Sequence, residues 1–238
     1  EDVTRAVDYL RDILTLTPDH GPTVKLLEEL VAGNAEPMLA AEVLEPLYQD
    51  LAEWRKLIGV IEVKLKNTEE DWQKVELFHQ AANLLQSDLH LDAPGEAFDM
   101  YARALPLDRS NEKTLLQLDE LANQTNRFED FARLIDAQLE GLDDTEVAVS
   151  LGLRVAAIYE ERLDRGPDAI ERYRRVLACD ENNSDAILHL DKLYQLSEQW
   201  AELAAILQKE AQITQDPEES LNVQFRLGQL YQQELENV

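Results

Sequence analysis

An internal repeat constrains this chain more than any other feature. Shifting the sequence by 74 residues places residues 44–48 over residues 118–122, and a further shift of 72 places them over residues 190–194. The same shifts carry Trp54 onto Phe128 and then onto Trp200. A chain that matches itself at a fixed period stacks similar units along its length.

Each copy of the repeat contains four apolar stretches with helical periodicity, so the elementary unit is a two-helix hairpin of about 36 residues. No stretch alternates apolar and polar residues over the length of a strand, and an all-α fold of about 13 helices is therefore predicted. Gly and Pro number only 8 each, as suits long helices. The expected helices span residues 2–16, 22–32, 37–50, 52–66, 69–89, 95–106, 111–124, 127–140, 145–163, 167–178, 184–196, 199–213 and 217–235.

Helix start signals support several of these boundaries. A short oxygen-bearing side chain precedes an acidic first turn at Thr68, Asn111, Asp144 and Asp216, where such groups satisfy free backbone amides and the helix dipole. Pro46 lies inside the expected helix 37–50 and is predicted to kink it or end it early.

The recurring small and large apolar residues form a recognisable pattern. The clearest copy has Leu153, Val155, Ala156 and Tyr159, followed by Ala169, Tyr173, Val176 and Leu177; the copy before it has Ala81, Ala82, Leu85, Ala97, Tyr101, Ala104 and Leu105; the last has Leu227, Gly228 and Tyr231. This pattern resembles the tetratricopeptide repeat, although Asp108 and Asp180 replace its closing proline. Half-a-tetratricopeptide repeats and related helical-repeat classes stay open as alternatives.

The resemblance implies a right-handed α-solenoid of antiparallel helix hairpins, a tetratricopeptide-like superhelix. We expect one repeat domain over residues 1–238, with super-repeats at about 44–117, 118–189 and 190–238 and a partial repeat at 1–43. No polar capping helix is visible at either end, and the chain is expected to be a segment of a longer repeat protein.

The charge balance excludes several classes of partner. With 22 Lys and Arg against 49 Asp and Glu, the formal net charge is −27, which disfavours nucleic acid and anionic membrane surfaces. No apolar run approaches the roughly 20 residues of a membrane span, so no membrane insertion is expected. The single cysteine, Cys179, permits no intramolecular disulfide. We expect a cytoplasmic protein, with a periplasmic one as the alternative.

The inventory of motifs argues against catalysis. The sequence has no Gly-rich phosphate loop, no closely spaced His pair and no nucleophile elbow. Its four histidines fall on different expected helices or loops, so neither a metal site nor a cofactor is predicted. The recurring Tyr and Trp residues are interpreted as core residues.

In a repeat solenoid, the first helices of the hairpins form a concave wall, and side chains not used in packing point into it. Amide side chains on such a wall suit a peptide backbone, because they both donate and accept hydrogen bonds. The groove candidates are His79, Asn83, Gln86, Lys113, Gln117, Glu120, Asn123, Arg154, Glu160, His189, Lys192, Gln195, Arg226 and Gln229.

One subset of positions matches those that clamp a peptide C-terminal carboxylate in tetratricopeptide domains. These positions are held by His79, Asn83, Gln117, Ser150 and Arg154, of which only Asn83 and Arg154 match in residue type. A solvated face without a ligand is the simpler interpretation of the wall.

The sequence therefore predicts a non-catalytic scaffold that binds a protein or peptide, preferably a basic one, through the concave groove. The first alternative is a structural module of a larger repeat protein, self-associating through its end helices; the second is an accessory domain of an enzyme. Charge reversal at Glu120 and Glu160 is expected to damage only groove binding, whereas Leu227 and Leu230 are expected on an apolar stacking face.

Overall fold

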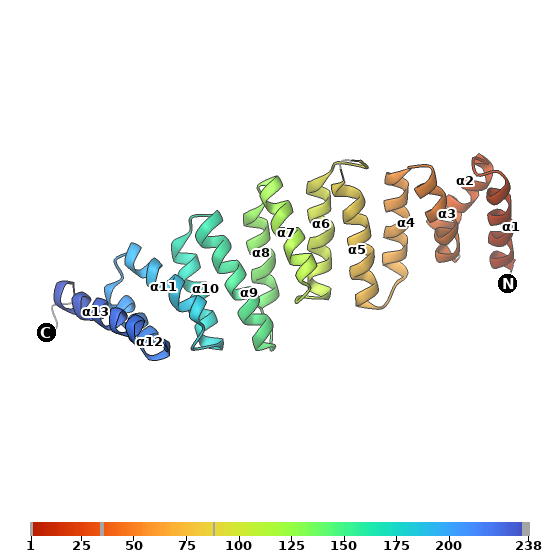
Figure 1. The fold of residues 1–238 in the computed structure, drawn as a ribbon. Helices are drawn as coiled ribbons and strands as arrows, with labels where there is room; N and C mark the ends of the chain where they lie inside the picture. The colour runs from red at the N-terminus through yellow and green to blue at the C-terminus, as the bar shows by residue number, and fades with distance from the viewer. Residues whose placement is uncertain (1, 34–35, 88, 235–238) are drawn as a thin grey trace. The chain divides into compact units, whose positions relative to one another are not determined.

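The computed structural model describes residues 2–33, 36–87 and 89–234, and within these ranges the fold is entirely helical (Figure 1). The thirteen expected helices are confirmed there. They are α1 (Asp2–Leu16), α2 (Gly21–Ala32), α3 (Pro37–Asp50), α4 (Trp54–Asn67), α5 (Asp71–Gln86), α6 (Pro94–Ala104), α7 (Glu112–Thr125), α8 (Phe128–Leu139), α9 (Thr145–Ala157), α10 (Gly166–Cys179), α11 (Ser184–Leu196), α12 (Trp200–Ile213) and α13 (Pro217–Gln233).

The chain divides into two compact units, residues 1–127 with α1 to α7 and residues 128–238 with α8 to α13. Within each unit, consecutive helices joined by short turns pack side by side as antiparallel hairpins, as α5 packs on α6 and α9 on α10 (Figure 1). We call α3, α5, α7, α9, α11 and α13 the first helices, and α4, α6, α8, α10 and α12 the second helices. The single repeat domain over residues 1–238 stays a prediction.

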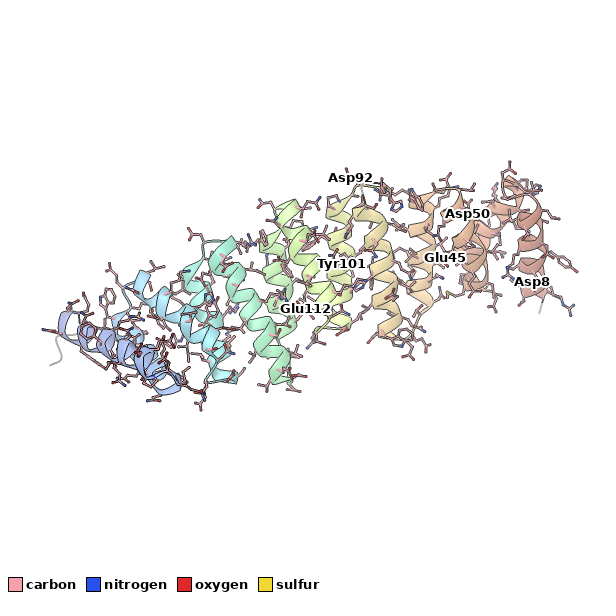
Figure 2. All side chains as sticks on the ribbon, in the orientation of Figure 1. Asp8, Glu45, Asp50, Asp92, Tyr101 and Glu112 are labelled. Atoms are coloured by element: carbon pink, nitrogen blue, oxygen red, sulfur yellow. The ribbon has the colours of Figure 1, made fainter. Side chains whose placement is uncertain are left out.

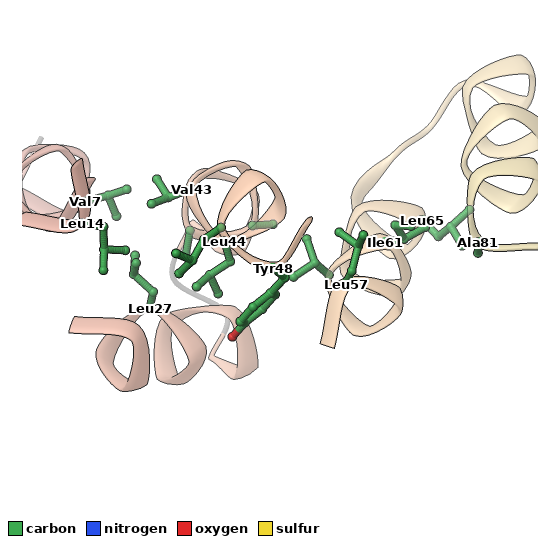
Figure 3. Packing of buried hydrophobic residues seen from close by; sticks show 14 of the residues in the cluster. Val7, Leu14, Leu27, Val43, Leu44, Tyr48, Leu57, Ile61, Leu65 and Ala81 are labelled. Atoms are coloured by element: carbon green, nitrogen blue, oxygen red, sulfur yellow. The ribbon is translucent and has the colours of Figure 1, made fainter. Parts of the chain in front are cut away.

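Apolar side chains from successive helices form the core of the first unit. Leu44 and Tyr48 of α3 point toward the same interior as Leu57 and Ile61 of α4 (Figure 3). Fully buried alanines such as Ala81 let neighbouring helices approach closely, and the large rings fill the space between them. Burial of each large apolar side chain contributes about 1.5–3 kcal/mol.

The second unit uses the same construction. Tyr173 and Val176 of α10 are buried, as are Val155 and Ala156 of α9, and the two helices pack against each other. The closest approach is at Gly152, where a Cβ atom would lie only 2.8 Å from the Cγ2 atom of Val176. Glycine is therefore required at this point of α9 by packing.

The helix caps expected from the sequence are mostly confirmed. The Asn111 side chain accepts a hydrogen bond from the amide of Thr114, and Asp144 and Asp216 cap α9 and α13 in the same manner. Thr68 is an exception: its hydroxyl donates to the carbonyl of Lys64 at the end of α4, and the next helix begins only at Asp71.

Pro46 does not end its helix early, so that part of the expectation is wrong. Helix α3 continues through Pro46 to Asp50. The residue is exposed, so the carbonyl of Glu42, which would have accepted from a residue-46 amide, lies on the side of the helix that water reaches.

Two helices end differently from the expected ranges. The stretch 95–106 finishes as a 3₁₀ turn, Leu105–Leu107, which contains Pro106. The stretch 145–163 passes from α9 into a π-turn, Ile158–Arg162. Such turns often mark functional positions in helices, and this one carries Glu160.

Candidate functional site

Polar side chains connect successive first helices within each unit, and several of the predicted groove residues take part. In the first unit, Gln86 of α5 donates through Nε2 to Oε1 of Gln117 on α7 at 3.0 Å, and Gln117 in turn donates to Glu120 at 3.1 Å. Asn83 accepts a hydrogen bond from the Tyr101 hydroxyl at 3.1 Å; Figure 2 shows Tyr101 on α6. Three predicted groove residues, Gln86, Gln117 and Glu120, are thus joined by hydrogen bonds.

His79 does not face an open groove as expected. It is only 3% exposed, and its Nε2 atom lies 2.8 Å from the hydroxyl oxygen of Thr114. Burial lowers the pKa of the His79 imidazole, and the charge of Lys113 lowers it further. The ring is therefore a structural contact between α5 and α7, whereas Lys113 and Asn123 of α7 are exposed.

In the second unit, Glu160 is the centre of a cluster. Its side chain is only 7% exposed and accepts from His189 Nδ1 at 2.7 Å, from Lys192 Nζ at 2.7 Å and from the Tyr173 hydroxyl at 3.1 Å. Burial raises the pKa of Glu160, but the hydrogen bonds from Lys192 and His189 outweigh burial and hold it below its usual range. Charge reversal at Glu160 would break its hydrogen bonds to His189 and Lys192 of α11, so we now expect it to lower stability as well as to affect binding.

A pocket of about 340 Å³ lies beside this cluster in the second unit. Its lining residues come from α9, α10 and α11 and are Ser150, Leu153, Arg154, Ala157, Tyr173, Asp185 and His189. The structure thereby brings together Ser150, Arg154 and His189, while Asp185 places a carboxylate in the same pocket. An anionic terminus would meet that carboxylate, so this pocket is poorly suited to clamp a carboxylate.

Two further pockets, one in each unit, are built from matching positions of the repeat. The first unit holds a pocket of about 450 Å³ and the second a pocket of about 290 Å³. Seven lining positions recur at a constant spacing of 146 residues, as from Trp54 to Trp200. The matched pairs are Gln49 and Gln195, Trp54 and Trp200, Leu57 and Leu203, Ile61 and Leu207, Gln80 and Arg226, Asn83 and Gln229, and Leu84 and Leu230.

In both of these pockets, two first helices provide the rim and the second helix between them provides the floor. The floor is apolar and the rim is polar. The first pocket also contains Glu45, labelled in Figure 2, and His90, whose ring meets that of Trp54 edge to face at 4.3 Å. We call these two sites the tryptophan pockets.

The interpretation of the recurring tryptophans as core residues is only partly right. Trp54 packs against the core, but Trp54 and Trp200 are only partly buried and line open pockets, and Trp72 is 68% exposed. Their position at the first residue of a second helix was the available signal, because a large ring there lies at the end of a hairpin. Gln195 and Gln229 of the second tryptophan pocket were among the predicted groove residues.

Leu230, expected on an apolar stacking face together with Leu227, is buried and lines this second tryptophan pocket. Arg226 donates to both carboxylate oxygens of Asp191, at 2.7 and 2.8 Å. This pair links α11 to α13 at the rim of the pocket.

The second helices are connected by arginine–carboxylate pairs. In the first unit, Arg55 pairs with Glu96 and Arg103 with Glu62, both between α4 and α6. In the second unit, Arg165 pairs with Glu129, and Arg172 binds Asp136 at 2.7 Å, between α8 and α10. This face is therefore occupied by contacts within the chain.

No group of three or more His, Cys, Asp or Glu in residues 2–33, 36–87 and 89–234 is arranged to hold a metal ion. None of the helices in the same ranges is both long and apolar enough to span a membrane.

No protein-family model and no curated protein matches the chain. Solved structures similar to it include the TPR domain of P58(IPK), at 13% identity and a TM-score of 0.37, with 98% of this chain and 66% of that chain covered. YrrB, described as a TPR protein with an unusual peptide-binding site, has 18% identity, a TM-score of 0.39 and coverages of 83% and 97%. Yeast Tom70 has 13% identity, a TM-score of 0.28 and coverages of 97% and 59%.

The chain thus spans less than two thirds of the P58(IPK) and Tom70 chains. TM-scores this low carry no argument about shared sites, so the description of the pockets rests on this chain's own residues. The resemblance to tetratricopeptide-repeat proteins rests on the repeat pattern and the helix hairpins of this chain itself.

Proposed function

We propose that the chain is a non-catalytic protein-interaction scaffold, which binds an extended peptide segment of a partner protein along its first helices. The observation that carries this proposal is the tryptophan pocket, because the repeat builds it once in each unit from matching positions. An apolar floor with a few amide groups at the rim is a typical composition for a binding pocket. Amides at the rim supply both donors and acceptors to a peptide backbone.

The charge of the chain favours a basic partner. A formal net charge of −27 attracts cationic segments and speeds their association, and the effect weakens as salt is added. The proposal therefore includes a partner segment with net positive charge.

A second function, assembly with further helical repeats or with another copy of the chain, is favoured by a different observation. Helix α1 exposes Tyr9 and Leu16, and α13 exposes Leu221 at 68% and Phe225 at 63%. Stacking of another helix on either surface would remove these side chains from water. This second function is tested by sedimentation velocity of the wild type and of the Leu221→Gln, Phe225→Gln double variant. It requires that the wild type associates and that the double variant is monomeric.

The scaffold proposal is tested with a random peptide library displayed on phage and selected on the immobilised full chain. Peptides that enrich are then synthesised, and their Kd values are measured for the wild type and for the Asn83→Ala, Gln229→Ala double variant. Loss of one hydrogen bond in each pocket should weaken binding about fivefold.

Gln212→Ala is the matched control, since Gln212 is an exposed amide on the second helix α12. It should leave the Kd unchanged. The proposal fails if no peptide enriches above the level on an unrelated acidic protein, or if the double variant binds as well as the control.

A further inference from the structure

We propose that the two tryptophan pockets are equivalent anchor sites, so that one chain binds two copies of the same motif: a large apolar side chain flanked by cationic residues. This inference rests on the proposed function and names its ligand. The first argument is structural equivalence, because Trp54 and Trp200 occupy matching positions and begin α4 and α12.

The floors of the two pockets have the same chemistry. Leu57 and Ile61 are 5% and 2% exposed in the first, and Leu203 and Leu207 are 4% and 1% exposed in the second. The floors present apolar side chains, so they suit an aliphatic or aromatic side chain of the motif. A partly buried tryptophan ring adds an apolar wall beside each floor.

Two of the charged side chains at the rims are paired within the chain. In the first unit, Glu45 binds Lys64, and in the second, Arg226 binds Asp191. An ionic group placed on either apolar floor would lose its water without gaining a partner there, so the centre of the motif is apolar. The surplus of acidic residues acts over a longer range on the residues that flank it, and these are therefore cationic.

The two sites differ in ways that predict unequal affinities. The first pocket has a volume of about 450 Å³ against about 290 Å³ for the second, and His90 adds a second ring beside Trp54. The first pocket can therefore cover more of a large apolar side chain. We therefore expect the first site to bind more tightly than the second.

The test uses the three tryptophans of the chain as reporters in ¹⁵N-labelled protein. The probe is the blocked peptide acetyl-Gly-Lys-Lys-Leu-Lys-Lys-Gly-amide, and the indole N–H signals are followed by NMR during titration. Trp54 and Trp200 should shift with saturation, while Trp72, exposed on α5 and outside both pockets, should not move.

Stoichiometry is measured by isothermal titration calorimetry with the same peptide. We expect two equivalents for the wild type and one for Trp54→Leu or Trp200→Leu, each checked for wild-type helicity by circular dichroism. A peptide with Ala in place of its Leu should bind at least about tenfold more weakly, because its side chain buries less apolar surface.

Saturation at one equivalent, equal shifts of all three indoles, or no shift of Trp54 and Trp200 would overturn the inference. Its failure is distinguishable from failure of the scaffold proposal. If display-selected peptides bind but leave the Trp54 and Trp200 signals unmoved, only the anchor sites are wrong; if no selected peptide binds, the scaffold function itself is wrong.

Discussion

Replacement of Gly152 by alanine tests the packing of the second unit most directly. The added Cβ would lie 2.8 Å from Cγ2 of Val176, whereas carbon atoms pack best at about 3.5–4.0 Å. Val176 is 2% exposed, and its branched side chain has few rotamers available. Helices α9 and α10 must therefore separate by several tenths of an ångström to accept the methyl group.

Two opposing contributions set the expected change in the free energy of unfolding. Overpacking of this kind costs about 1–3 kcal/mol, whereas Gly to Ala inside a helix gains about 1 kcal/mol. The net prediction is a loss of about 1 kcal/mol, which lowers the Tm by roughly 2–4 °C for a chain of this size. Thermal unfolding followed by circular dichroism and urea denaturation measure it.

Gly228→Ala supplies the control in the same unit. No atom lies within 4 Å of a Cβ built at Gly228 on α13, so only the helix propensity acts and stability should rise by about 0.5–1 kcal/mol. In a double-mutant cycle, Val176→Ala should relieve part of the cost of Gly152→Ala. The argument is refuted if Gly152→Ala is as stable as Gly228→Ala, or if the cycle shows no coupling.

Three further predictions concern other elements of the chain. Pro46→Ala should raise the free energy of unfolding, measured by urea denaturation, by about 1–2 kcal/mol, because an exposed proline inside a helix has poor helix propensity and lacks a backbone hydrogen bond. Unchanged stability would contradict this prediction. Glu160→Gln should lower the free energy of unfolding by about 1–3 kcal/mol through weaker bonds to Lys192 and His189. Since the pKa of Glu160 is lowered in the folded protein, the carboxylate stabilises the fold above about pH 4.3, and this contribution is lost as pH falls. The free energies of unfolding of the wild type and the variant should therefore become equal in acid. Burial raises the pKa of Tyr101 to about 12, so its contribution is complete below about pH 10 and is lost as pH rises toward 12. The late phase of the absorbance titration at 295 nm, to which Tyr48, Tyr159, Tyr173 and Tyr194 also contribute, should lose the amplitude of one tyrosine in Tyr101→Phe.

Prediction from sequence succeeded where local signals and the repeat agreed. The small residues Ala81 and Ala156 and the rings of Tyr101 and Tyr173 were placed in the core by periodicity, and all four are buried. Each repeat position has the same neighbours in every copy, so one well-matched copy predicts the packing of the others. That redundancy explains why helix number and most boundaries were predictable.

The remainder depended on tertiary contacts that spacing along one helix does not contain. His79 is buried, and its ring is hydrogen-bonded to the hydroxyl of Thr114, 35 residues later in the sequence. Glu160 is hydrogen-bonded to His189 from the next hairpin. It lies in a π-turn, whereas the apolar periodicity predicts ordinary α-helix at this position. The openness beside Trp54 depends on how closely α3 and α5 approach, which no local pattern specifies.

The first and second helices differ in the chemical groups that they leave available to a partner. Arg55 and Arg103 on the second helices are used in pairs between neighbouring hairpins, and so is Arg172 in the other unit. Such pairs hold neighbouring second helices in register while neutralising their own charges, which leaves that face with little chemistry to offer a partner. Because these cations are used inside the chain, the surplus of carboxylates determines the outward field, and the tryptophan pockets add apolar sites among the first helices. Under the proposed function, long-range attraction and short-range apolar contact both contribute to affinity. We therefore expect a peptide with only the charges or only the apolar side chain to bind weakly.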